Sequence, residues 1–156
     1  MRPDEAARVV ELQQLVQSTA ALLDAEQLAD WVDLFDAAGS YQVSSFSTEL
    51  RKPVIWWQQQ APELRKTLSD VPRHVRDPAQ RLHVLGPPLI RLDGDAAQAD
   101  TAFSLYRTLP TGETSLYLVG RYKDELCRTE SGVWKYRLHR VEVATRVLEM
   151  FTHLPV

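Results

Sequence analysis

The stretch from Leu82 to Ala144 most constrains what this chain can fold into, because it combines alternating segments with turn sequences. Residues 97–106, 116–127 and 134–139 place apolar side chains at every second position, which is typical of a strand with one buried face. Glycine allows a positive φ in each of the connections, which are Asp93-Gly94-Asp95, Pro110-Thr111-Gly112-Glu113 and Glu130-Ser131-Gly132. The stretch therefore predicts a strongly curved, four-stranded antiparallel meander.

Three irregularities within this stretch predict departures from regular strands. The apolar positions change phase after His139-Arg140, which predicts a β-bulge there. Gly86-Pro87-Pro88 interrupts the first strand, so this strand is expected to lie at an edge or to be split in two. Gly120 in the middle of a segment indicates curvature or a plain bulge.

The first third of the chain has helical periodicity. One apolar stripe recurs at spacings of three and four residues and consists of Val9, Leu12, Val16, Thr19 and Leu23. Asp24 followed by Gln27 resembles a capping box for a second helix, which Gly39 would end. The core side of that helix would be Leu28, Trp31, Val32 and Phe35.

The remaining segments complete an α+β plan. Residues 41–44 predict a short strand, 45–52 a loop, and 62–68 a third helix. Residues 1–156 are therefore expected to form a single domain, in which a curved antiparallel β-sheet forms a cone and the N-terminal helices from Pro3 to Ala38 pack on its concave face.

Composition excludes several classes of function. The net charge of −3 gives no basic field for nucleic acid. The charged N-terminus is followed by no apolar segment, so neither a secretion signal nor a membrane span is expected. The single cysteine, Cys127, excludes an internal disulfide framework and favours a cytoplasmic location.

The order of these elements resembles the cone fold shared by nuclear transport factor two, ketosteroid isomerase, scytalone dehydratase and the polyketide cyclases. Within it, the chain after about Leu12 is similar to the β (small) subunits of aromatic-ring-hydroxylating dioxygenases. The segments similar to their opening are Leu23-Asp24-Ala25-Glu26-Gln27, Trp31-Val32-Asp33-Leu34-Phe35 and Tyr41-Gln42-Val43. The segments similar to their closing strands are Val119-Gly120-Arg121-Tyr122-Lys123-Asp124, Gly132-Val133-Trp134-Lys135 and Arg140-Val141. Leu85-Gly86-Pro87-Pro88 and Thr111-Gly112-Glu113-Thr114 resemble the branch acting on aromatic carboxylates.

The resemblance implies a non-catalytic structural β subunit of an oxidoreductase complex. Its α partner would carry a Rieske iron–sulfur cluster and a mononuclear iron, typically with three α against three β subunits, the β subunits contacting one another as a trimer. A Rieske centre needs two cysteines and two histidines, and this chain has one cysteine. The four histidines, His74, His83, His139 and His153, have no paired helical spacing for an iron site. No cofactor or metal is therefore expected in this chain.

Subunit contacts are the expected role of several residues. Trp56 and Trp57 are adjacent, so on a strand one meets the core and the other faces outward, where tryptophan is enriched at interfaces. Arg121 and Lys123 lie on a charged strand face, which is either solvated or at the rim of a contact. The apolar tail after Thr145, which includes Phe151, either packs on its own domain or, as the resemblance favours, lies near the subunit contacts.

A stand-alone isomerase or dehydratase of the same fold is the alternative function. Such an enzyme performs general acid–base chemistry with residues in an apolar cavity between sheet and helices. The candidates are Asp33, Asp36, Tyr41, His83 and His139. Each also has a structural interpretation: solvated aspartates on the helix, a tyrosine with its hydroxyl at the rim, a hydrogen-bonded structural histidine at position 83, and a histidine on the polar face at position 139.

Overall fold

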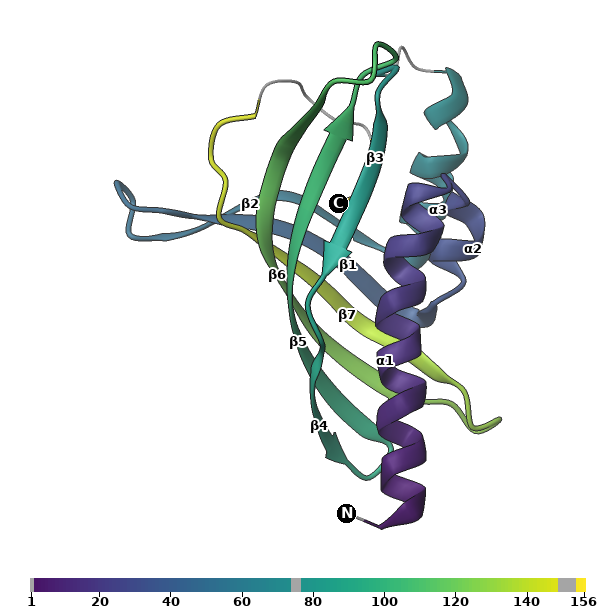
Figure 1. Cartoon of the computed structure of the whole chain (residues 1–156). Coiled ribbons are helices and arrows are strands. Elements are labelled where there is room, and N and C mark those ends of the chain that lie inside the picture. The colour runs from purple at the N-terminus through teal and green to yellow at the C-terminus, as the bar shows by residue number, and fades with distance from the viewer. Residues whose placement is uncertain (1, 74–76, 149–153) are drawn as a thin grey trace.

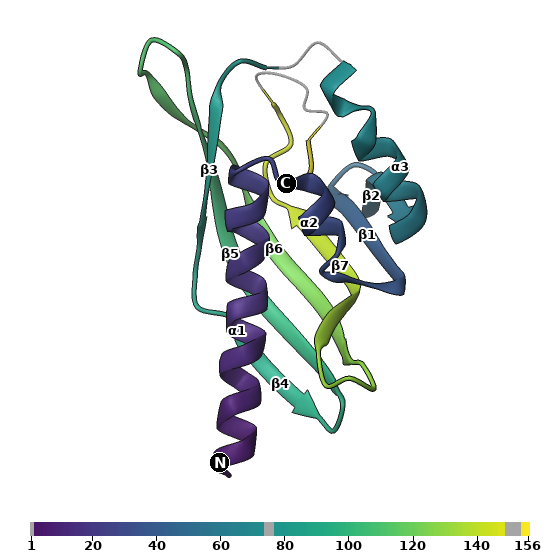
Figure 2. The ribbon, with the colours of Figure 1, turned by 90° about the vertical axis from the view of Figure 1, so that its right-hand side faces the viewer.

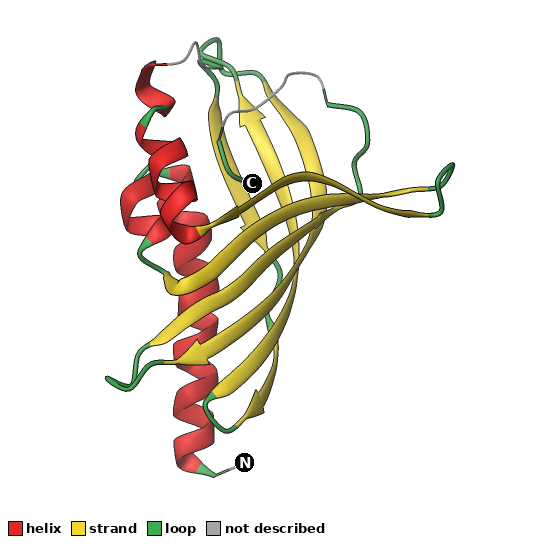
Figure 3. Ribbon diagram, turned by 180° about the vertical axis from the view of Figure 1, so that it is seen from behind, coloured by secondary structure: helices red, strands yellow, loops and turns green. Residues whose placement is uncertain are grey.

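A strongly bent sheet of seven strands faces one long helix in the computed structural model of the chain, which describes residues 2–73, 77–148 and 154–156 (Figure 1). All the helices lie on one side of the sheet (Figure 3). In chain order the elements are α1 (Pro3–Asp24), α2 (Leu28–Val32), β1 (Phe35–Ser47), β2 (Lys52–Gln60), α3 (Ala61–Ser69), a 3₁₀ turn η1 (Val71–Arg73), β3 (Gln80–Leu85), β4 (Leu89–Asp93), β5 (Ala96–Thr108), β6 (Thr114–Arg128) and β7 (Trp134–Val143). The predicted α+β class and cone shape are confirmed.

The strand order in the sheet is β2-β1-β7-β6-β5-β3, and β4 also pairs with β5. The predicted meander from Leu82 to Ala144 is confirmed, because β3 and β4, β5, β6 and β7 follow one another as antiparallel neighbours. The prediction of an antiparallel sheet is wrong for one pair of neighbours, because β1 and β7 are parallel. A parallel pair requires a crossover between its strands, and the long chain segment between β1 and β7 provides it.

Glycines occupy the predicted turns. Gly94, Gly112 and Gly132 have φ values of 60°, 93° and 85°, which confirms the glycine-dependent turns between β4 and β5, β5 and β6, and β6 and β7. The split of the first strand at Gly86-Pro87-Pro88 is also confirmed, since β3 ends at Leu85 and β4 begins at Leu89.

A β-bulge bends β7 two residues before the predicted position. Glu125 pairs with Leu138 and Leu126 pairs with Tyr136, which leaves Arg137 as the extra residue on β7. Because side chains alternate along a strand, the insertion at Arg137 turns His139 toward the helices. The prediction that His139 lies on the polar face is therefore wrong.

The second helix is shorter than predicted, and the strand after it is longer. α2 ends at Val32, and Phe35 already belongs to β1, which replaces the predicted helix end, the short strand and residues 45–47 of the predicted loop. A Cβ on Gly39 would lie 2.5 Å from the carbonyl oxygen of Tyr136 on β7. Gly39 therefore allows close approach of two strands and does not cap a helix.

The core lies between the concave face of the sheet and the helices (Figure 2). α1 contributes Leu12, Val16 and Leu23, which confirms the predicted apolar stripe. The C-terminal residue Val156 is 4% exposed and belongs to the same core. The described end of the tail therefore packs on its own domain, and Phe151 lies outside the described residues. No helix within the described ranges is long and apolar enough to span a bilayer.

Gly120 has the least room for a Cβ of the glycines in the chain, which makes it a test of the bend. A Cβ at this position would lie 2.3 Å from the carbonyl oxygen of Glu142 and 3.0 Å from the Phe103 ring. We predict that Gly120→Ala lowers the free energy of unfolding in urea by about 1–3 kcal/mol or more, as overpacking does. The matched control is Gly86→Ala, whose Cβ would make only ordinary contacts, the nearest at 3.5 Å. Equal stability of the two variants would contradict this account of the bend.

Candidate functional site in the cone interior

A histidine–aspartate pair joins the end of α1 to β3. The Nδ1 atom of His83 lies 2.6 Å from Oδ1 of Asp24, and the backbone N–H of His83 donates to the same carboxylate. An ionised carboxylate only accepts hydrogen bonds, so Nδ1 carries the proton and Nε2 presents a lone pair. Burial lowers the pKa of His83, which favours this neutral form. The pair therefore holds a base inside the cone.

A second pair lies deeper, between adjacent strands β6 and β7. Nδ1 of His139 lies 2.6 Å from Oδ1 of Asp124, and both side chains are fully buried. Burial raises the pKa of Asp124, although His139 opposes that shift. The imidazole stacks on Tyr41 at 5.7 Å between ring centroids and contacts the edge of Tyr122 at 4.7 Å. The bulge at Arg137 thus places a polar pair in an aromatic environment.

Arg81 and Tyr122 complete the polar lining. Arg81 stands two residues before His83 on β3, so both side chains point to the same face. Burial lowers the pKa of Arg81, whose charge acts on the Tyr41 and Tyr122 hydroxyls and on Asp24. Tyr122 is 0% exposed, and burial raises its pKa well above the usual value. We call the following six residues the interior polar cluster: Asp24, Arg81, His83, Tyr122, Asp124 and His139.

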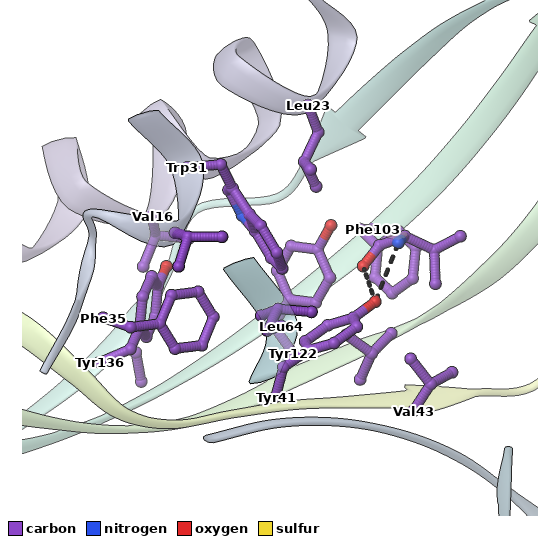
Figure 4. Close-up of a cluster of buried hydrophobic side chains, with 14 of the residues drawn as sticks. Val16, Leu23, Trp31, Phe35, Tyr41, Val43, Leu64, Phe103, Tyr122 and Tyr136 are labelled. Carbon is purple, nitrogen blue, oxygen red and sulfur yellow. Dashed lines mark hydrogen bonds between the residues drawn. The ribbon is translucent and has the colours of Figure 1, made fainter. Parts of the chain in front are cut away.

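Tyr41 stands beside this cluster and is hydrogen bonded to the end of the chain. Its hydroxyl donates to the carbonyl oxygen of Val156 at 3.3 Å and accepts from the Val156 N–H at 3.0 Å (Figure 4). The labelled side chains of Trp31, Phe35 and Tyr136 form the apolar wall nearby (Figure 4). Tyr41 is fully buried, so the expectation that its hydroxyl lies at the rim is wrong.

A groove connects the cluster to the surface. It has a volume of about 660 Å³ and is lined by residues 23–26 at the end of α1 and 77–81 at the start of β3. Asp24 and Arg81 belong both to this lining and to the interior polar cluster. Within the groove, Asp77 forms an ion pair with Arg107. A small molecule entering the groove would therefore meet Asp24 and Arg81.

The structure brings together only part of the predicted acid–base set. Tyr41, His83 and His139 meet in the cone interior, whereas Asp33 and Asp36 do not. The Asp33 side chain is 63% exposed and forms an ion pair with Arg65 at 2.5 Å. Asp36, at the start of β1, accepts the backbone N–H of Ala38.

Four members of the interior polar cluster were not among the candidates predicted from the sequence: Asp24, Arg81, Tyr122 and Asp124. Asp24 was assigned to a helix cap and Arg81 received no role, and neither carries a local signal of burial. Asp124 does carry one, because it alternates in phase with the apolar residues Tyr122 and Leu126. A carboxylate in phase with a buried face indicates a paired, buried acid.

The predicted interface residues occupy two surfaces. Trp56 is the bulged residue of β2 and is 41% exposed, while Trp57 contacts Tyr41 at 5.4 Å between ring centroids. The two tryptophans thus face opposite ways, as predicted. Arg121 and Lys123 both form ion pairs with Asp100 across the neighbouring strand.

The described part of the chain offers no ligand set for the iron centres that the resemblance implies for the partner. In the part of the chain that the structure describes, no group of three or more histidine, cysteine, aspartate or glutamate residues could hold a metal ion. His83 and His139 each bond an aspartate through Nδ1. Cys127 is a free cysteine on β6, and a Rieske centre needs two.

The lowered pKa of His83 predicts a pH dependence of stability. The folded chain holds His83 neutral where the unfolded chain, with a pKa of about 6.5, begins to bind a proton. The free energy of unfolding should therefore fall as the pH falls from about 7 to 5, and the fall should be smaller in His83→Gln. The raised pKa of Asp124 acts in the opposite direction in both proteins. Urea unfolding at both pH values measures the difference, and equal slopes would contradict a buried neutral His83.

Comparisons with known proteins agree with this architecture. The chain is 28% identical over 148 residues to the β subunit of 2-aminobenzenesulfonate 2,3-dioxygenase from an Alcaligenes species, covering 94% of this chain and 98% of that protein. A chain from Novosphingobium aromaticivorans assigned as the β subunit of an aromatic-ring-hydroxylating dioxygenase superposes with a TM-score of 0.80 at 19% identity, covering 96% and 99%. A chain from the same organism assigned as a scytalone dehydratase superposes with a TM-score of 0.71 at 13% identity, covering 99% and 95%.

These similarities span nearly the whole chain and confirm the resemblance to dioxygenase β subunits in the cone fold. The sequence also matches the SnoaL-like domain family over residues 4–140, which include every member of the interior polar cluster. The chain belongs to the SnoaL-like domain family.

Proposed function

We propose that the chain is a non-catalytic β subunit of an aromatic-ring-hydroxylating dioxygenase and assembles with an iron-carrying α subunit. The observation that carries this proposal is the near end-to-end similarity to a dioxygenase β subunit, over 94% of this chain and 98% of the relative. The iron centres and the oxygen chemistry would belong to the α subunit, because this chain has one cysteine and each described histidine of the interior is bonded to an aspartate. The single cysteine also suits a cytoplasmic location.

The substrate would be an aromatic acid. The relative acts, by its name, on an aminobenzenesulfonate, which is an aromatic ring with an acidic substituent. The segments around Gly86 and Gly112 support the branch that acts on aromatic carboxylates. Selection among such substrates would reside in the α subunit, next to the iron.

The hairpin of β1 and β2 is the surface that best suits subunit contact. It projects from the body of the molecule (Figure 1) and carries exposed large apolar side chains, namely Phe46, Leu50, Ile55 and Trp56. Exposed apolar side chains gathered on one projecting element favour a protein interface. The charged strand face with Arg121 and Lys123 would lie nearer the β–β contacts of a trimer.

Substitution of Trp56 tests this interface. We predict that Trp56→Ala lowers the amount of α subunit co-purifying with the tagged chain at least tenfold, as loss of an interface hot spot does. The matched control is Val133→Ala, which shortens another exposed apolar side chain, at the turn between β6 and β7. Light scattering should show the isolated wild-type chain as a trimer or larger oligomer. Unchanged co-purification of the folded variant would refute a role for the hairpin in docking.

A stand-alone isomerase or dehydratase is the second candidate, favoured by the Asp24–His83 pair. His83 presents a neutral base inside the cone, and a scytalone dehydratase-like chain shares the fold. The purified chain can be tested alone for thermal stabilisation by small cyclic ketones and enols and for their turnover. Turnover abolished by His83→Gln, in a chain that purifies without any α subunit, would favour the enzyme over the subunit.

A further inference from the structure

A pocket of about 260 Å³ lies on the outer face of the sheet, while all the helices lie on the other side (Figure 3). Asp124 and His139 face the cone interior, so the alternation of a strand points their neighbours Lys123 and Arg140 outward. These two cations stand directly opposite each other on β6 and β7, and both line the pocket. Arg91 on β4 contributes a third cation to the lining.

The cations of this outer pocket share one bonded carboxylate. Asp100 forms ion pairs with both Lys123 and Arg121. Burial favours the neutral acid, but Lys123 and Arg121 outweigh it and hold the pKa of Asp100 below its usual value, so this carboxylate is ionised and shared by two cations. Among the described residues, the ion pairs of this face end at Asp100, and neither Arg91 nor Arg140 forms one.

The outer pocket therefore carries an excess of positive charge. Glu125 also lines it but forms no ion pair with any described residue. Three lining cations thus face two outward carboxylates, one of which is also held by Arg121 from outside the lining. Like charges that stand directly opposite each other on neighbouring strands destabilise a sheet. An anion bound beside Lys123 and Arg140 would remove that repulsion.

The donors and the size of the pocket define the anion. Arginine and lysine bind oxygen anions through short, charge-assisted hydrogen bonds. The donors come from three strands, β4, β6 and β7, so an ion whose oxygens point in several directions suits them better than a planar carboxylate. The volume of about 260 Å³ is smaller than the roughly 300–1,000 Å³ of pockets for drug-sized ligands, which favours a small ion.

We propose that the outer pocket binds a free tetrahedral oxoanion, sulfate or phosphate, whose oxygens accept hydrogen bonds from Arg140, Lys123 and Arg91. The bound dianion would neutralise the like-charged pair across β6 and β7 and stabilise the folded chain, because it binds the folded state alone. All of these donors belong to one chain, so the site does not depend on the proposed subunit role.

Isothermal titration of the full-length chain with sulfate and with phosphate tests the proposal, in chloride buffer of constant ionic strength. Acetate, which is planar and singly charged, is the control ion. We expect sulfate or phosphate to bind saturably and at least tenfold more tightly than acetate. Arg140→Met should weaken that binding at least tenfold, and Arg91→Met several-fold. The matched control is Arg137→Met, because Arg137 is an exposed arginine on the same strand outside the pocket lining.

Thermal unfolding separates a binding role of Arg140 from a structural one. In chloride, Arg140→Met removes one of two opposed like charges, so its Tm should equal or exceed that of Arg137→Met. Low concentrations of sulfate should then raise Tm further in the wild type and Arg137→Met than in Arg140→Met. The general strengthening of apolar burial by sulfate acts on all three proteins alike, so the difference reports binding at the pocket.

The proposal would be overturned if neither sulfate nor phosphate bound saturably, if acetate bound as tightly, or if Arg140→Met bound them like the wild type. A Tm of Arg140→Met several degrees below that of Arg137→Met in chloride would also overturn it, since Arg140 would then be structural. Co-purification with an α subunit is measured separately, so failure of this site and failure of the subunit role are distinguishable.

Discussion

The close approach of β6 to β7 at Gly120 is the constraint on which the rest of the structure depends. The carbonyl oxygen of Glu142 occupies the space where any other residue would carry its Cβ, and the Phe103 ring lies against the same position. This contact lets the sheet curl, and the bulge at Arg137 then turns His139 inward. Without the curl, the concave face could not enclose two histidine–aspartate pairs between sheet and helices. The same residue thus governs the fold and the candidate site.

The elements that carry their own local signals could be predicted from the sequence, whereas the elements set by distant contacts could not. Gly94, Gly112 and Gly132 identify the turns because a positive φ is a property of a few residues. Gly39 was misassigned because its role is set by the approach of Tyr136 across the sheet. The parallel pairing of β1 with β7 joins segments about a hundred residues apart, and alternation within either strand carries no information about it.

The candidate site was harder to predict than the fold, for a related reason. His83 and Tyr41 were predicted as candidates. Their neighbours Asp24 and Arg81 were not, because Asp24 lies at a helix end and Arg81 in a polar segment at the start of β3, where charged residues are common on the surface. His139 faces inward only because the bulge precedes it by two residues. A site assembled from α1, β3, β6 and β7 depends on tertiary packing, so a single sequence indicates its residue types better than its geometry.

Two features of the chain suit different functions, namely subunit assembly and chemistry in the interior of the cone. The projecting hairpin with Trp56 suits assembly, while the interior polar cluster keeps buried groups that packing alone would not favour. The most direct measurement for the subunit assignment is native mass spectrometry, with iron quantification, of the complex recovered on a tagged copy of this chain from its own cells. Our account predicts equal numbers of this chain and of a partner with Rieske-type cysteine and histidine ligands, with all the iron in the partner. Recovery of this chain without such a partner, or with stoichiometric iron of its own, would contradict it.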